Sequence, residues 1–111
     1  MSDIPHEAIQ FLYSNAKPFG IAKGQRVGIE NTLRHKKALL MRKASLSGFT
    51  TTAAQEREAY ADLEYFQLIE GLEAATIIEE TLLWQMKAAQ MRIEVWKTES
   101  YVNRQVEKSL S

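Results

Sequence analysis

A seven-residue repeat of apolar side chains runs through the second half of this 111-residue chain. With Tyr65 taken as position a, nine of the ten a and d positions are apolar, and the exception is Glu79. The ten positions are Tyr65, Leu68, Leu72, Ala75, Glu79, Leu82, Met86, Ala89, Ile93 and Trp96. A repeat sustained over this length places one stripe of a long helix against a partner helix. It therefore predicts an all-α fold, a helical hairpin or coiled-coil-like bundle with one long C-terminal helix.

A second apolar stripe lies on the opposite side of the same predicted helix. It is formed by Ile77, Thr81, Trp84, Ala88, Met91 and Val95. Burying one large apolar side chain stabilises a protein by roughly 1.5–3 kcal/mol, so a stripe left exposed to water loses several such contributions. A chain this short has few elements to cover both stripes. We therefore expect a homo-oligomer with Ile77, Trp84, Met91 and Val95 in its interface. The alternative is a monomer in which helices from the first half cover both stripes.

The first half of the chain is expected to contain two helices. Pro5 suits the first turn of a short helix over residues 5–16. Pro18 and Gly20 then favour a break, and a basic helix is expected over residues 21–44. Glycines recur at positions 20, 24 and 28, which favours a flexible entry into this helix over a small-residue packing face.

Residues 45–52 are rich in hydroxyl side chains and contain a glycine, so they predict a turn. Thr52 followed by Gln55 matches a capping box at a helix start. The long helix is then expected over residues 53–107, with allowance for a kink near Asp62. Residues 1–111 are thus expected to form a single helical domain.

Opposite charges are segregated along the chain, although the net charge is zero. Residues 17–43 carry eight basic side chains against Glu30, and residues 56–80 carry eight acidic side chains against Arg57. The basic run is the best candidate for a nucleic-acid-binding surface. The candidate DNA-binding residues are Arg34, Lys36, Lys37, Arg42 and Lys43. The alternative is that the basic run pairs with the acidic segment when the chain turns back at residues 45–52. DNA binding and charge pairing are both possible if several copies of the chain bring their basic helices together. Glu79, inside the apolar stripe, is expected to fix register or to pair with a lysine of the basic helix.

The chain offers little that could support catalysis. It has no cysteine, and its two histidines, His6 and His35, lack the spacing of a metal-binding motif. It contains neither a nucleophile elbow nor a phosphate-binding loop. We therefore expect no catalytic residues, no metal and no cofactor. No segment approaches the roughly 20 apolar residues of a membrane span, and no secretory signal opens the chain. The default expectation is a cytoplasmic protein without a membrane partner.

Three blocks carry a resemblance to a known family. They are Lys36–Met41, then Arg57–Tyr60 with Tyr65 and Leu72, and finally Arg92–Thr98. Over about residues 25 to 100 the chain resembles small helical phage proteins of the UvsY recombination mediator family. The resemblance implies a homo-oligomeric ring that binds single-stranded DNA and helps a recombinase displace the single-strand-binding protein. It also implies a location in the host cytoplasm, and it assigns the DNA contacts to the basic helix, at Lys36, Lys37, Arg42 and Lys43.

These expectations combine into one functional hypothesis and one alternative. The first is a non-enzymatic, oligomeric recombination mediator that binds single-stranded DNA. The alternative is a phage protein-interaction module that inhibits or redirects a host or defence complex through the Trp84 stripe or the acidic segment.

Overall fold

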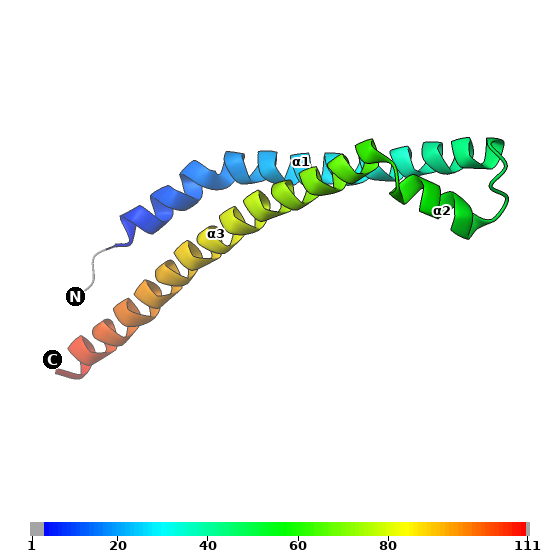
Figure 1. Cartoon of the computed structure of the whole chain (residues 1–111). Helices are drawn as coiled ribbons and strands as arrows, with labels where there is room; N and C mark the ends of the chain where they lie inside the picture. The colour runs from blue at the N-terminus through cyan, green and yellow to red at the C-terminus, as the bar shows by residue number, and fades with distance from the viewer. Residues whose placement is uncertain (1–3, 111) are drawn as a thin grey trace. The chain divides into compact units, whose positions relative to one another are not determined.

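The computed structural model describes residues 4–110, which form three α-helices and, within that range, no strand. They are α1 (His6–Leu46), α2 (Thr52–Tyr60) and α3 (Leu63–Leu110) (Figure 1). The predicted all-α class with one long C-terminal helix is confirmed. Residues 1–3 and 111 of the expected domain lie outside the described residues.

The chain divides into two compact units, each built from parts of the same two long helices. Within the described residues, one unit contains the start of α1, up to Gly20, and the part of α3 from Glu80 onward. The other unit runs from Ile21 to Glu79 and contains the rest of α1, all of α2 and the start of α3. The boundary in α1 falls two residues after Pro18.

The expected break between two helices at Pro18 and Gly20 is wrong, because α1 is continuous from His6 to Leu46. A proline inside a helix removes one backbone hydrogen bond and crowds the preceding turn. The apolar face continues on both sides of it, with Ala8 buried before the proline and Ala22 buried after it. Packing of this face outweighs the local propensity of Pro18 and of the glycines.

The turn after α1 is closed by a Schellman motif at Gly48. The Gly48 N–H donates to the Ser45 carbonyl, and the Phe49 N–H donates to the Ala44 carbonyl. Gly48 has φ +101°, a left-handed conformation that glycine adopts without the steric penalty of a side chain. The predicted turn over residues 45–52 is therefore placed correctly, although α1 extends to Leu46.

The start of α2 is capped one residue earlier than expected. Thr51 is the N-cap, and its Oγ1 accepts from the Ala54 N–H at 3.2 Å. The predicted box of Thr52 and Gln55 does not form, because Thr52 is already the first residue of α2. The side-chain Nε2 of Gln55 donates to the Phe49 carbonyl at 2.9 Å. With three consecutive threonines, the sequence does not reveal which of them takes the extended N-cap conformation.

The predicted single helix over residues 53–107 is two helices, separated near the expected kink. α2 ends at Tyr60, and α3 begins at Leu63. Asp62 caps the new helix, because its Oδ2 accepts from the Tyr65 N–H at 3.1 Å. The interruption at Asp62 is thus a helix restart, and α3 continues to Leu110.

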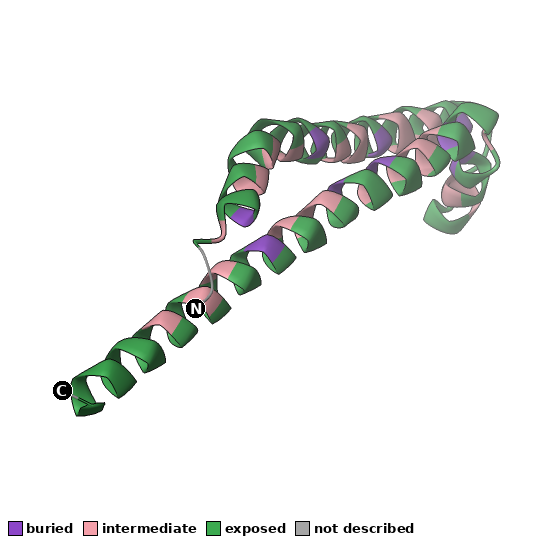
Figure 2. Ribbon diagram, turned by 90° about the vertical axis from the view of Figure 1, so that its left-hand side faces the viewer, coloured by how far each residue is buried: buried purple, intermediate pink, exposed green. Residues whose placement is uncertain are grey.

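The predicted seven-residue repeat correctly identifies the packed side of α3. All ten of its a and d positions are buried or half-buried, including Glu79. Figure 2 shows buried and half-buried residues along one side of the long helices and exposed residues along the other. Most buried side chains are small, and the described residues contain no large side chain that is fully buried. Each unit is therefore held together by a thin core.

Candidate nucleic-acid and self-association surfaces

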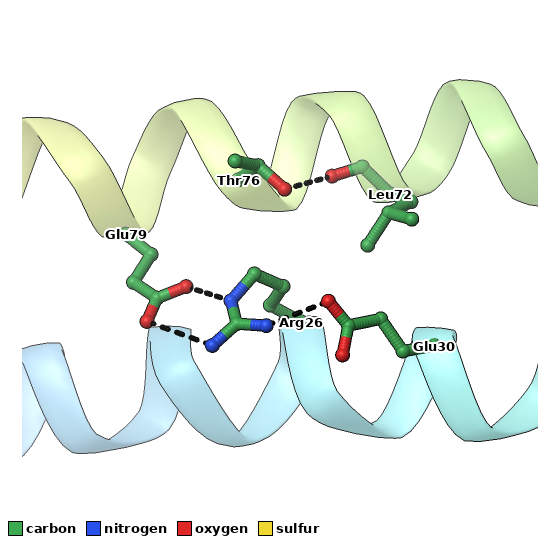
Figure 3. Close-up of polar contacts among 5 residues, drawn as sticks. All are labelled: Arg26, Glu30, Leu72, Thr76 and Glu79. Atoms are coloured by element: carbon green, nitrogen blue, oxygen red, sulfur yellow. Dashed lines mark hydrogen bonds and ion pairs between the residues drawn. The ribbon is translucent and has the colours of Figure 1, made fainter.

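Arg26 and Glu79 form a side-chain ion pair between α1 and α3 within the unit Ile21–Glu79. Glu79 is only 6% exposed, and the Nε and Nη2 of Arg26 donate to its two carboxylate oxygens, the second at 3.3 Å. The Arg26 Nη1 donates to Glu30 Oε1 at 2.7 Å (Figure 3). The hydrogen bonds that Arg26 donates to Glu79 and, to a smaller extent, to Glu30 raise the pKa of Arg26 above its usual value. The sequence predicts that Glu79 fixes register or pairs with a lysine of the basic helix. The structure pairs it with Arg26, an arginine of that helix.

Two of the five candidate DNA-binding residues are paired with the acidic part of the chain. The Lys36 Nζ lies 2.6 Å from Glu64 Oε2. The Lys37 Nζ donates to the Tyr60 hydroxyl at 3.0 Å and lies 4.0 Å from Glu56 Oε1. The hydrogen bonds to Glu64 and to Tyr60 raise the pKa of Lys36 and of Lys37, respectively. For these two lysines the structure shows the charge-pairing alternative.

The other three candidates, Arg34, Arg42 and Lys43, are exposed and make no ion pair within the described residues. Since a helix turns by about 100° per residue, Arg34 and Arg42 lie about 80° apart on the outer side of α1. Lys43 instead lies on the side of Lys36, beside a shallow pocket that it lines with Asp62. The five candidates are therefore distributed around α1 and do not form a single row.

The outer side of α1 includes a basic residue that the sequence reasoning left out of the site. Lys23 is exposed and lies 11 residues before Arg34, which turns it by only about 20° from that arginine. We call Lys23, Arg34 and Arg42 the α1 basic face. Helical spacing alone could have identified Lys23, because the three side chains follow one side of a continuous helix.

All four predicted interface residues are exposed in the single chain. Trp84 is 63%, Met91 65% and Val95 50% exposed, and all three lie on the part of α3 after Glu79. Ile77, in the other unit, is 67% exposed. Within the described residues, neither unit covers its own part of the second stripe.

A lysine and a groove lie beside the exposed stripe of α3. The Lys87 Nζ lies 4.4 Å from the ring centroid of Trp84, a cation–π distance. A groove beside the stripe is lined by Ile4, Pro5, Met91, Val95 and Trp96, among others. The Nε1 of Trp96 is buried without a hydrogen-bond partner within the described residues, as is the Oγ of Ser100.

Neither a metal-binding cluster nor a membrane-spanning helix is found in the described part of the chain. His6 and His35 are exposed, and residues 4–110 contain no cluster of three or more side chains able to hold a metal ion. Within the same residues, no helix combines the length and the apolar character needed to cross a bilayer. Comparison of the chain with protein-family models, with curated proteins and with solved structures gave no match.

Proposed function

We propose that this chain is a non-enzymatic helical protein that associates with itself and binds single-stranded DNA through the α1 basic face and Lys43. One observation carries the proposal: Arg34 and Arg42 are exposed and have no acidic partner within the described residues. The acidic segment, residues 56–80, could neutralise the basic run, but its ion pairs within the described residues are with Arg26, Lys36 and Lys37.

Free guanidinium groups on one side of a helix suit a phosphate backbone. Arginine donates two parallel hydrogen bonds to a phosphate, and each phosphate contact releases a counterion. Because the chain has no net charge, long-range attraction to DNA is weak and binding depends on these local contacts. Self-association then strengthens binding, because several basic faces engage one strand together.

The resemblance to UvsY mediators extends the proposal to a place in recombination. In that role the chain binds the strand while a recombinase replaces the single-strand-binding protein. Both proteins are proposed partners. Lys36 and Lys37 contribute less than the arginines, because their ammonium groups already contact Glu64 and Tyr60.

Replacing both exposed arginines tests the DNA-binding surface. The variant Arg34→Ala/Arg42→Ala should weaken binding to a labelled single-stranded oligonucleotide, measured by fluorescence anisotropy. The slope of log affinity against log salt should fall by about 1.4, since each lost phosphate contact removes about 0.7 on a single strand. Circular dichroism should be unchanged, because both side chains are exposed and alanine favours helix.

The matched control removes two exposed arginines elsewhere. Arg57→Ala/Arg104→Ala carries the same charge change outside the α1 basic face and should leave affinity and salt slope close to those of the unmodified chain. Equal weakening by both double variants would show that only overall charge matters. Absence of binding by the unmodified chain at about 50 mM salt, where phosphate contacts are strong, would contradict the proposal.

The exposed Trp84 stripe favours a second candidate, a module that binds and redirects another protein. Exposed tryptophan and methionine side chains on a helix are typical of protein–protein interfaces. A stoichiometric complex with a host or defence protein, lost in Trp84→Ala and formed by a chain without DNA affinity, would select this candidate over the first.

A further inference from the structure

The stripe Trp84, Ala88, Met91 and Val95 is exposed along one side of α3 and lies entirely within one unit. We propose that its partner is the same stripe on a second copy of the chain, packed antiparallel about a two-fold axis in one register. The axis lies between Ala88 and Met91. This inference rests on the self-association in the proposed function and is independent of its DNA-binding part.

The spacing of the stripe is symmetric, which a two-fold axis requires. Its members are separated by four, three and four residues, so reversal of the helix superimposes the stripe on itself. Antiparallel pairing then places Trp84 on the partner's Val95 and Ala88 on the partner's Met91. Each layer combines a larger side chain with a smaller one, an arrangement that lets facing helices interdigitate.

The charged side chains beside the stripe select the antiparallel direction. Lys87 and Glu94 lie along one border, and Gln85 and Arg92 lie along the other; all four are exposed. In an antiparallel pair each border faces the same border of the partner helix. Lys87 therefore faces the partner's Glu94, and Glu94 faces the partner's Lys87. On the other border Arg92 faces the partner's Gln85, so this register contains two attractive contacts and no like-charge contact among these positions.

Parallel pairing through the same stripe brings opposite borders together and juxtaposes like charges. Lys87 would then face the partner's Arg92, and Glu94 would face the partner's Glu99. Like charges facing each other oppose association and suppress the wrong arrangement. The parallel direction is therefore disfavoured at both positions.

Antiparallel registers displaced by one heptad also juxtapose like charges. Displacement in one direction places Lys87 against the partner's Lys87. Displacement in the other places Glu94 against the partner's Glu94 and Arg92 against the partner's Arg92. Of these four arrangements, only the register with Trp84 on the partner's Val95 satisfies both the layer packing and the border charges.

Charge reversal at Lys87 distinguishes the directions. Lys87→Glu should weaken self-association about tenfold or more, equivalent to about 1.4 kcal/mol, because both copies of the contact become repulsive in the antiparallel pair. In a parallel pair the same change would face Arg92 and strengthen association. The dissociation constant is measured by sedimentation equilibrium, and circular dichroism monitors folding.

Complementary variants test the register itself. Glu94→Lys alone should also weaken association. An equimolar mixture of Lys87→Glu and Glu94→Lys should recover it as a heterodimer, because both cross-contacts then join a glutamate to a lysine. Lys17→Glu, the same charge change at an exposed position of α1 outside the α1 basic face, should leave the dissociation constant unchanged.

The proposal is overturned by any of three results. These are an unmodified chain that stays monomeric at its solubility limit, a Lys87→Glu variant that associates as well as or better than the unmodified chain, and a mixture that recovers no heterodimer. Oligonucleotide binding is measured separately on the same samples. A dimer without DNA affinity would refute the proposed function and leave this inference standing.

Discussion

Glu79 is the one charged residue that is buried in the described part of the chain, and it interrupts an otherwise apolar stripe. A carboxylate in this position is stable only if its hydrogen bonds are satisfied, and Arg26 satisfies both oxygens. Sliding α1 by one turn within the unit Ile21–Glu79 would separate the pair and leave the carboxylate buried alone. The contact therefore specifies the register of the two helices in that unit more than it adds to stability.

Removing the arginine should destabilise the chain more than removing both charges. In Arg26→Met the Glu79 carboxylate stays buried without a partner, so urea unfolding followed by circular dichroism should show a clear loss of stability. Arg26→Met/Glu79→Leu should recover most of that loss. The exposed pair of Glu94 and Lys97 is the control, and Lys97→Met should change stability by no more than about 0.5 kcal/mol. A double variant no more stable than Arg26→Met would contradict this account.

The raised pKa of Lys36 predicts a response to alkaline pH. Its pairing with Glu64 favours the charged form in the folded chain, so the pKa lies above the usual 10.5. A raised pKa means that the contribution to stability is complete below the unfolded value and is lost as pH rises through the folded value. Stability should therefore fall more steeply above about pH 10.5 in the unmodified chain than in Lys36→Met. Equal slopes in alkaline urea titrations would argue against a contribution from this pair.

At the scale of helices, the sequence predicts what periodicity and local chemistry encode. The repeat from Tyr65 to Trp96 identifies the packed side of α3, and the hydroxyl-rich stretch around Gly48 locates the turn. The predicted break at Pro18 is wrong, because packing on either side outweighs the local propensity there. The pairing of Arg26 with Glu79 could not be derived either, since it depends on helix register across 53 residues.

Glycine substitutions in α1 and in the turn should have opposite effects. A Cβ added at Gly24 meets no other atom within 4 Å, so Gly24→Ala should stabilise the helix by about 0.5–1 kcal/mol. Gly48 has equal space but φ +101°, so Gly48→Ala should destabilise the chain by about 1 kcal/mol. Urea unfolding at one fixed protein concentration measures both. A loss of stability in Gly24→Ala would mean that this side of α1 packs closely against another chain.

At the scale of the whole molecule, the core of each unit is thin, so the proposed self-association should contribute strongly to stability. The buried apolar residues are mostly alanines, namely Ala8, Ala22, Ala44, Ala59, Ala75 and Ala89. Each alanine buries little area compared with leucine or phenylalanine. The stripe around Trp84 offers larger side chains to a partner than its own unit buries, since the buried residues among the described positions of that unit are Ala8 and Ala89. The melting temperature should therefore rise with protein concentration, as it does when association stabilises the folded state.

The two tryptophans provide separate reporters of that association. Trp84 lies on the exposed stripe, whereas Trp96 is half-buried on the packed side of α3. Trp96→Phe leaves Trp84 as the single tryptophan, and acrylamide should quench it strongly in dilute solution and progressively less as concentration rises. In Trp84→Phe, quenching of Trp96 should vary little with concentration, because packing within the chain already shields its ring. Trp84 quenching that stays constant while sedimentation shows a growing mass would place the interface elsewhere. A mass beyond that of two copies would favour the ring implied by the UvsY resemblance over a closed two-fold pair.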